Sequence, residues 1–384
     1  MSYQDALARV IDEVVAPTAA EVDAAGVFPR RQIEALAAAG LLSLTVPAEF
    51  SGGGEGLRAA AYVARELGAV CGSTAMVVTM HYAATAALAA GGAKEALAEI
   101  GAGQHLSTLA FSEAGSRSHF WAPLSTAAPA GPNGPTGPDD AGVRLDARKS
   151  WVTSAGEADS YVWSSQPLAA DGPMTLWLVP GGAAGLSVSG SFDGLGLRGN
   201  GSAPMTADGL VVPAGAMIGA DGAGLDLALA AVLPVFLVCT ASMSAGLMRR
   251  LAEETAAHLQ RTQLQHLGVS LAQQVQPRAQ LARLQIEADR ARGLIEDTLA
   301  AVEQGRADAQ LQVLEVKAAA GEAAADAADL ALRACGGAAF RKESVVERLF
   351  RDSRAARVMA PTTEALHDFI GRALCGLPLL GDAA

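Results

Sequence analysis

The chain has 384 residues, 51% of them hydrophobic and 18% charged, which provides a full core for one or two domains and excludes a disordered chain. Its 28 Lys and Arg residues are outnumbered by 40 Asp and Glu, giving a net charge of −12 that disfavours binding to nucleic acid or to an anionic membrane surface. The four cysteines lack CxxC spacing and the six histidines lack metal-ligand spacing, so we expect neither disulfides nor a metal site.

The N-terminus does not have the pattern of a secretory signal, because acidic residues occur early and no basic start precedes an apolar run. The segment from Leu227 to Met248 has 22 residues without a formal charge, which is long enough to cross a bilayer. It contains Pro234 and several hydroxyl side chains, and no cluster of Lys and Arg precedes it. We interpret it as a buried helix and expect a soluble, cytoplasmic protein without a membrane partner.

The first predicted region, from Tyr3 to about Leu109, is helical. From Ile33 onward apolar residues recur at i, i+3, i+4 and i+8, and Gly40 marks the probable end of that helix. Further Ala-rich helical runs cover residues 58–67 and 73–90.

From about Ser112 to Val212 short segments alternate apolar and polar residues between Gly, Pro and Asp, which is typical of strands and turns. These segments are VRLDARKSWVTS, YVWSSQ, MTLWLVP, LSVSG and GLVVP. The stretch from Ala128 to Gly142 is too rich in Pro and Gly to pack as an element and predicts a surface loop between two strands. Trp151 and Thr153 stand two apart on a predicted strand, so we expect both side chains to face one side.

After Gly224 the pattern is helical again, with an apolar stripe followed by a long helical run over residues 315–334 that Gly336 and Gly337 would end. The stripe consists of Leu281, Leu284, Ala288, Ala291, Ile295 and Val302. This order predicts an α+β protein with an N-terminal helical domain (1–110), a central β-barrel-like domain (111–222) and a C-terminal four-helix bundle (223–384). The uncharged 227–248 run and the stripe offer more apolar surface than a monomer covers, so we expect an oligomer with a helical interface.

The glycines of GLGLRG (Gly194, Gly196 and Gly199) satisfy the dinucleotide-binding pattern GxGxxG. That pattern binds pyrophosphate only where it follows a strand and opens a helix. Here NGSAPMTADGLVVP follows, which predicts a turn and a strand. We therefore interpret these glycines as structural.

Five segments in order resemble the acyl-CoA dehydrogenase family along nearly the whole chain. They are FPRRQIEALAAAGLLSLTVPAEFSGGGEG, FSEAGSRS, KSWVTSAGEADSYV, GLGLRGNGS and ALRACGGAAFRKESVVERLFRDSRAARV. FSEAGSRS is similar to the family's LTEPxAGSD segment, shortened by two residues after the Glu, and KSWVTS to its K-x-W-I-[ST]-N segment. Each match alone is weak, but their order across a helix–β–helix layout identifies the chain as a member of the family.

The resemblance implies FAD bound between the β domain and the helical bundle, usually in a dimer of dimers. In the family a Glu carboxylate takes the α-proton of an acyl thioester, bound to CoA or a carrier protein, while the flavin accepts the β-hydride. An electron acceptor or flavin reductase would be a further partner.

Matched motif to motif, the resemblance implies roles for several residues at the cofactor. Ser112 would hydrogen-bond the flavin ring, Trp151 would lie against it, and Thr153 and Ser154 would reach its polar edge. Ser116 would lie near the pyrophosphate or the thioester. Gly336 and Gly337 would let another subunit's backbone approach the cofactor.

The family's usual base stands in a Y-E-G-T segment, and here the sequence departs from it. In RDSRAARVMAPTTEAL that register puts Ala360 at the Glu, Pro361 at the Gly and Thr362 at the Thr, and Thr362 is the last residue that we assign to the cofactor site. Proline would also stiffen the place where a glycine normally follows the base.

Other family members carry the base on the first bundle helix, where this chain has Phe236 and Leu237. Neither Ala360 nor Phe236 can accept a proton, and loss of a positioned base typically costs about 10²–10⁴-fold in rate. The catalytic base is thus unknown from the sequence. Glu364, one helical turn after Ala360, is the nearest carboxylate and the only candidate we name.

A second departure concerns the half of the cofactor site that a neighbouring subunit donates. The family's RxxFG reads LQHLG here, with Leu264 at the Arg and Leu267 at the Phe, and Arg333 replaces the Gln before the double glycine.

Three functions remain open at this point. The chain is an FAD-dependent oxidoreductase acting on the CH–CH bond of an acyl thioester with an unconventional base, a base-less partner subunit paired with a paralogous chain, or a flavin-dependent monooxygenase on the same fold. Resemblance of fold does not decide among them.

Overall fold

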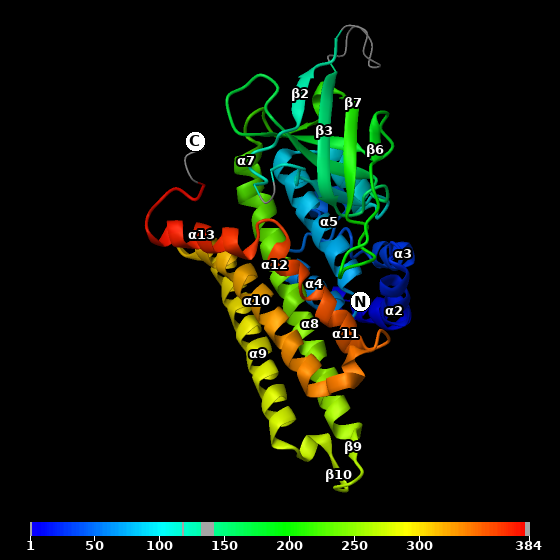
Figure 1. Ribbon diagram of the computed structural model, residues 1–384. Coiled ribbons are helices and arrows are strands. Elements are labelled where there is room, and N and C mark those ends of the chain that lie inside the picture. Colours follow the sequence, from blue (N-terminus) through cyan, green and yellow to red (C-terminus); the bar gives the residue numbers. More distant parts are fainter. Residues whose placement is uncertain (1, 117–118, 132–141, 381–384) are drawn as a thin grey trace.

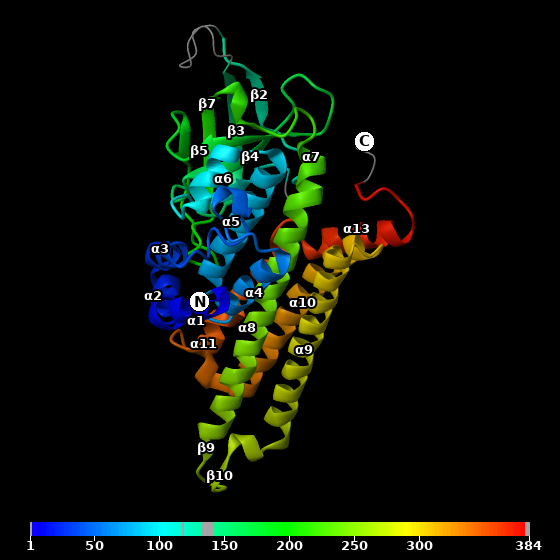
Figure 2. The ribbon, with the colours of Figure 1, turned by 180° about the vertical axis from the view of Figure 1, so that it is seen from behind.

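The computed structural model describes residues 2–116, 119–131 and 142–380. Helices of the N-terminal part pack beside a long bundle of C-terminal helices, and two β-sheets lie at one end of that bundle (Figures 1 and 2). The fold is that of an N-terminal helical domain, a central β-sheet domain and a C-terminal helical domain.

The N-terminal part begins with α1 (Tyr3–Val10), capped by Ser2, whose hydroxyl accepts a hydrogen bond from the Asp5 amide. The helices that follow are α2 (Ala16–Ala25), α3 (Arg30–Ala38), α4 (Leu57–Gly68), α5 (Gly72–Gly91) and α6 (Lys94–Gly101). α5 is apolar on nearly all sides and mostly buried, because it lies between the other N-terminal helices, the first strand and the bundle.

The β region consists of two four-stranded sheets. In the first sheet β1 (Ser107–Ala110) pairs in parallel with β4 (Ser160–Ser165), followed by β5 (Thr175–Pro180) and β8 (Met217–Ile218). The second has the order β2 (Thr126–Pro129), β3 (Val143–Val152), β7 (Ala203–Val212) and β6 (Leu186–Val188). The expected helical region to Leu109 was too long, because β1 is a short, fully buried strand without the alternation that marks a half-exposed one.

The loop predicted over 128–142 overlaps the end of β2, because Ala128 and Pro129 belong to that strand, and β3 begins directly after it at Val143. Ala128 and Pro129 pair with Arg144 and Val143 as part of β2 and β3. Residues 132–141 lie outside the described part of the chain.

The expectation that Trp151 and Thr153 face one side is wrong. Residues 143, 145, 147 and 149 alternate inward along β3, but the register with β7 shifts between Lys149 and Val152. Trp151 adopts a left-handed backbone (φ 56°) and is 68% exposed, whereas Thr153 lies just past the strand and is 4% exposed. The β-bulge therefore turns the indole out of the alternation.

The C-terminal part is built on three long helices, α8 (Leu233–Arg261), α9 (Val275–Gln304) and α10 (Ala309–Cys335). A short helix α7 (Gly224–Leu227) precedes them, and the hairpin of β9 (Gln263–Leu264) and β10 (Val269–Ser270) joins α8 to α9 at the end far from the sheets (Figure 1). The chain ends with α11 (Val345–Asp352), α12 (Ala355–Val358) and α13 (Thr363–Leu374).

The uncharged run from Leu227 to Met248 forms the first half of α8 and the turns before it, and it lies in the core. α8 packs against α4, α5, α9 and α10, which bury Leu237, Val238 and Met248 completely. α5 and the stretch Gly224–Arg261 are long and apolar enough to cross a membrane by length and composition, but they are mostly buried core helices. This run is therefore not a surface that an oligomer has to cover, which corrects that part of the sequence argument.

The GLGLRG turn joins the β region to the helices. A Cβ on Gly196 would lie 2.5 Å from the Arg351 carbonyl oxygen, and the Leu197 amide donates a 2.7 Å hydrogen bond to the carboxylate of Asp352. Arg351 forms an ion pair with Asp23 on α2 at 2.5 Å. The glycine is thus required by the close approach of two backbones.

Replacing Gly196 by Ala should lower the free energy of unfolding by about 1–3 kcal/mol, because the new methyl group overlaps backbone that cannot move aside. Gly182→Ala is the matched control, since its Cβ would meet no atom within 4 Å. Urea denaturation of both variants measures the difference. Equal stability of the two variants would contradict the close packing at this turn.

Candidate functional site

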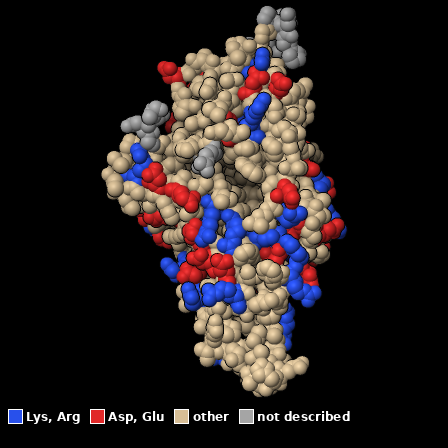
Figure 3. All heavy atoms as spheres, viewed as in Figure 1, with Lys and Arg blue, Asp and Glu red and all other residues tan. Residues whose placement is uncertain are grey.

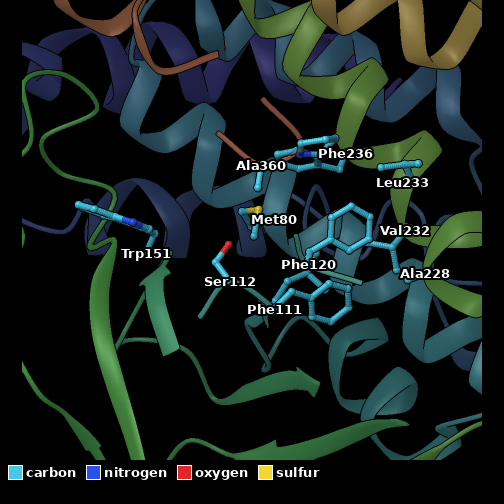
Figure 4. Close-up of a pocket in the computed structure, with 12 residues that line it drawn as sticks. Met80, Phe111, Ser112, Phe120, Trp151, Ala228, Val232, Leu233, Phe236 and Ala360 are labelled. Carbon is cyan, nitrogen blue, oxygen red and sulfur yellow. The ribbon is translucent and has the colours of Figure 1, made fainter. Parts of the chain in front are cut away.

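A cavity of about 70 Å³, open to solvent, lies where the sheets meet the helical bundle. The space-filling view shows a hollow at this level, with Lys and Arg side chains gathered below it over the bundle (Figure 3). α5, the end of β1, the start of α8 and the turn between α12 and α13 supply its walls (Figure 4). The lining residues are Met80, Leu109, Phe111, Ser112, Phe120, Trp151, Ala228, Val232, Leu233, Phe236, Ala360 and Pro361.

The cavity wall is apolar. Three phenylalanine rings, Phe111, Phe120 and Phe236, lie on one side, and the Ser112 hydroxyl and the Trp151 indole lie on the other (Figure 4). None of the twelve lining residues has an ionisable side chain. Such a wall binds an apolar group and excludes water, with the serine and the indole as its polar features.

Ala360 and Phe236 both line this cavity (Figure 4). The motif register in the sequence put these two residues at the places where relatives carry the catalytic base. Ala360 comes from the turn after α12 and Phe236 from the first turn of α8, so residues 124 positions apart meet at one wall. Glu364 is exposed in the first turn of α13 and is not part of the lining.

A buried ion pair fixes the side of the cavity that carries Ser112 and Trp151. Lys149 on β3 and Glu113, the residue after Ser112, form a salt bridge and are both almost fully buried. The Lys149 ammonium also donates to the carbonyl and hydroxyl oxygens of Ser164 at 2.7 and 2.9 Å. Burial lowers the pKa of Lys149 to about 8, against the opposite effect of the Glu113 carboxylate.

The Glu113 carboxylate is saturated with donors, as a buried charge requires. It accepts hydrogen bonds from the amides of Leu124 (2.5 Å) and Ser125 (3.0 Å), and from the Ser125 hydroxyl. The Ser150 amide donates to the Ser112 carbonyl oxygen at 2.9 Å, which ties the two segments together. The Glu113–Lys149 pair and this backbone hydrogen bond therefore fix the segments that carry Ser112 and Trp151 relative to each other.

The remaining predicted cofactor residues of the β region, Thr153, Ser154 and Ser116, are not part of the cavity lining. The Thr153 hydroxyl is 3.1 Å from the Ser202 hydroxyl. Ser154 has a left-handed backbone (φ 59°), and its buried hydroxyl has no hydrogen-bond partner in the part of the chain that the structure describes. The Ser116 amide donates to the Glu113 carbonyl oxygen at 3.4 Å, in the turn that follows Ser112.

Three other predicted residues do not line the cavity. Thr362 caps α13, where its hydroxyl accepts a 3.3 Å hydrogen bond from the Ala365 amide. Gly336 and Gly337 follow the C-terminal end of α10, towards the end of the bundle opposite the sheets (Figure 1). Any contact of these glycines with a cofactor would have to be with one held by another copy of the chain.

Sequence reasoning missed Met80, Phe111, Phe120 and the partners Glu113 and Lys149. A signal for Lys149 was present, since it falls on the inward phase of an alternating strand where a charge needs a buried partner. Met80 and Phe120 come from segments whose sequences look like ordinary core, so nothing local distinguishes them.

Two family models match this chain. The model described as "Acyl-CoA dehydrogenase, N-terminal domain" matches residues 2–100, and the model described as "Acyl-CoA dehydrogenase, C-terminal domain" matches residues 222–375. The two matches together span about two thirds of the chain.

Relatives that cover nearly the whole chain are also named as dehydrogenases of acyl-CoA compounds. The mitochondrial short-chain specific acyl-CoA dehydrogenase of Homo sapiens is 26% identical over 355 residues, covering 91% of this chain and 83% of the relative. The cyclohex-1-ene-1-carbonyl-CoA dehydrogenase of Geobacter metallireducens is 26% identical over 379 residues, covering 96% of each. The structure of butyryl-CoA dehydrogenase from Megasphaera elsdenii has the same fold, with a TM-score of 0.87 at 20% identity over 97% of this chain and 98% of that one.

Removing the charge of Glu113 should destabilise the protein strongly. In Glu113→Gln the buried Lys149 ammonium loses its carboxylate, which typically costs about 3–5 kcal/mol. Glu157→Gln is the matched control, because its ion pair with Arg30 is half-exposed and worth at most about 1 kcal/mol. Thermal or urea unfolding measures both variants, and a loss for Glu113→Gln no larger than for the control would refute the role of the pair.

Proposed function

Because the chain belongs to the acyl-CoA dehydrogenase family of oxidoreductases, we propose that it binds FAD beside Trp151 and acts on the CH–CH bond of an acyl thioester in the apolar cavity. The observation that carries this proposal is one cavity with an exposed indole and a serine hydroxyl on one side and phenylalanine rings on the other. Bound FAD would supply the hydride acceptor.

The residues present fit a flavin. The Trp151 indole is exposed although an aromatic ring of that size normally finds cover, so a planar ring system could stack on it. The buried Ser154 hydroxyl has no partner among the described residues, and a buried polar group of this kind calls for one. Ser112, Trp151, Thr153 and Ser154 would hold the ring system, with Ser116 further along the cofactor or near the thioester.

The acyl group would enter the phenylalanine side of the cavity. Phe111, Phe120 and Phe236 would cover its chain and exclude water from the reacting carbons. CoA and a carrier protein both present their acyl group as a thioester, so the cavity wall is compatible with either carrier.

The α-proton acceptor is the unconventional element of this proposal. An ordinary family member uses a carboxylate, and none of the lining residues that the structure describes has one. Glu364 is the nearest candidate, but as an exposed residue it would have to turn toward the cavity or act through another group.

The same observation supports two further candidate functions. A base-less chain could pair with a paralogous subunit, or it could use the flavin as a monooxygenase in a reaction that needs no α-proton base. The uncharged lining is compatible with the partner subunit and with the monooxygenase. Which of these functions the chain has decides whether its further partner is an electron acceptor or a flavin reductase.

We also propose an oligomer of this chain with itself or with a paralogue. Phe340 near the end of α10, Leu267 in the β9–β10 hairpin and Val275 at the start of α9 are 81%, 54% and 74% exposed. They are at the end of the bundle that also carries Gly336 and Gly337, where the altered residues Leu264 and Arg333 lie.

Trp151→Ala should lower the retention of FAD or shift the spectrum of the bound flavin, because it removes the exposed stacking surface. Leu195→Ala is the control, since Leu195 is 64% exposed but lies outside the cavity lining. Flavin content per chain and the absorbance spectrum of the purified proteins measure the effect. A folded Trp151→Ala protein with wild-type flavin content and spectrum would refute the cofactor site.

The chain alone should reduce its flavin slowly with straight-chain acyl-CoA, because the β-hydride leaves readily only as the α-proton departs. Rapid mixing of the FAD-loaded protein with acyl-CoA of several lengths, followed by flavin bleaching, measures this rate. Ala360→Glu could raise it, although Pro361 would misdirect the carboxylate, and an error of about 1 Å costs on the order of 10²-fold.

Fast bleaching by the wild-type chain without a partner would contradict this expectation. It would show that the chain has a base of its own, and Glu364→Gln is then the first variant to test. Slow bleaching that becomes fast on addition of a paralogous chain would favour the partner-subunit alternative. Oxygen consumption with reduced flavin would favour the monooxygenase.

A further inference from the structure

A second buried lysine, Lys317 on α10, lies directly behind the cavity wall. Only 1% of its surface is exposed. Its ammonium donates hydrogen bonds to three backbone carbonyl oxygens, those of Ala356 (2.9 Å), Met359 (2.9 Å) and Pro361 (2.6 Å). Met359 and Pro361 flank Ala360, which lines the cavity.

The three carbonyls belong to the segment where α12 ends and α13 has not yet begun. Carbonyls in the last turn of a helix have no partner inside the helix, so they need another donor. An ammonium group has three N–H donors, which equals the number of carbonyls gathered here. On the next turn of α10, Gly321 lets α12 come close, since a Cβ there would lie 3.3 Å from the Cβ of Ala356.

Lys317 differs from Lys149 because no carboxylate forms an ion pair with it in the described part of the chain. Glu364 on α13 is the charged group whose field reaches it. Several other charged groups on the elements packed against α10 form ion pairs of their own. They are Arg357 on α12, Arg354 directly before it, Arg351 on α11, Glu296, Asp297 and Glu303 on α9, and Arg249 and Arg250 on α8.

We propose that Lys317 is a positioning residue of the cavity, which in its charged form gathers the carbonyls around Ala360 and so fixes the α12–α13 turn against Phe236. The relevance of this inference to catalysis rests on the proposed function. The positioning of the turn by Lys317 does not require the cofactor. Lys317 touches neither the cavity nor a substrate in it, so it acts through the turn.

This arrangement makes the turn sensitive to pH. Burial lowers the pKa of Lys317 from 10.5 to about 7, with Glu364 acting in the opposite direction. Below that pH the ammonium supplies three donors. Above it the neutral amine has two N–H donors and a lone pair, so one buried carbonyl loses its hydrogen bond and faces the lone pair. The turn should therefore be held at acidic pH and loosened as the pH rises through neutrality.

A spin label on the turn tests this without FAD or substrate. Val358, in the last turn of α12, is 73% exposed, so Val358→Cys carries a nitroxide without disturbing the core. Cys375→Ser removes the one exposed native cysteine, while Cys71, Cys239 and Cys335 are buried. The electron paramagnetic resonance line shape of the full chain should change from immobilised to mobile as the pH rises, with its midpoint near 7.

Two variants and one control position complete the experiment. In Lys317→Met the label should be mobile at every pH, and in Lys317→Arg, which keeps the charge, it should stay immobilised. A label at Ile286→Cys, 56% exposed on α9, should show no dependence on pH. A circular dichroism spectrum checks that each variant folds. If Lys317→Met does not fold, the titrations of the wild type and of Lys317→Arg together test whether Lys317 causes the pH dependence.

A label at Val358 whose mobility does not change with pH in the wild type would overturn the proposal. So would the same pH dependence in Lys317→Met, because another group would then be responsible. If the label behaves as expected but flavin content and acyl-CoA reduction do not respond to Trp151→Ala, the proposed function fails while the positioning by Lys317 stands.

Discussion

The buried Glu113–Lys149 pair is the interaction on which the geometry of the β side of the cavity depends. It joins the segment that carries Ser112 to the strand that carries Trp151, and both partners are almost fully buried. A buried charge pair is tolerated only when its remaining donors and acceptors are also satisfied, and here Ser125, Leu124 and Ser164 complete the set. Because each hydrogen bond around this pair fixes its two partners, the segments that carry Ser112 and Trp151 cannot shift independently of each other.

The opposite wall depends on a different balance. Lys149 has a carboxylate, so its charge is neutralised where it lies, whereas Lys317 has only carbonyl oxygens. Carbonyl dipoles hold an ammonium through several weak partners rather than one strong one, and when the proton leaves only two N–H donors remain for the three carbonyls. One wall is therefore held by a buried ion pair with further hydrogen-bond partners, while the other, which carries Ala360, depends on the charge of a single lysine.

Periodicity was sufficient to predict the helix–β–helix order, and the helical runs expected over 58–67 and 73–90 match α4 and α5 to within one residue at each end. It failed where a local rule was overridden by packing. β1 has no alternation because both of its faces are buried, and Trp151 leaves the alternation of β3 because a bulge shifts the register. The motif register identified Ala360 and Phe236, but only the structure could show that both line one cavity. No local pattern marks Phe120 or Lys317, since their partners are distant in sequence.

The apolar lining and the missing carboxylate are consistent with each other in physical terms. A carboxylate at Ala360 would face phenylalanine rings and methyl groups, without any charged group in the lining to favour its ionised form. Burial of that kind raises the pKa of an acid, and a base in such a site works only if the substrate or cofactor supplies the missing hydrogen bonds. With alanine and phenylalanine at these places, the chain keeps an apolar cavity without desolvating a charge. A cavity built in this way suits a substrate that brings its own polar group to the Ser112 and Trp151 side.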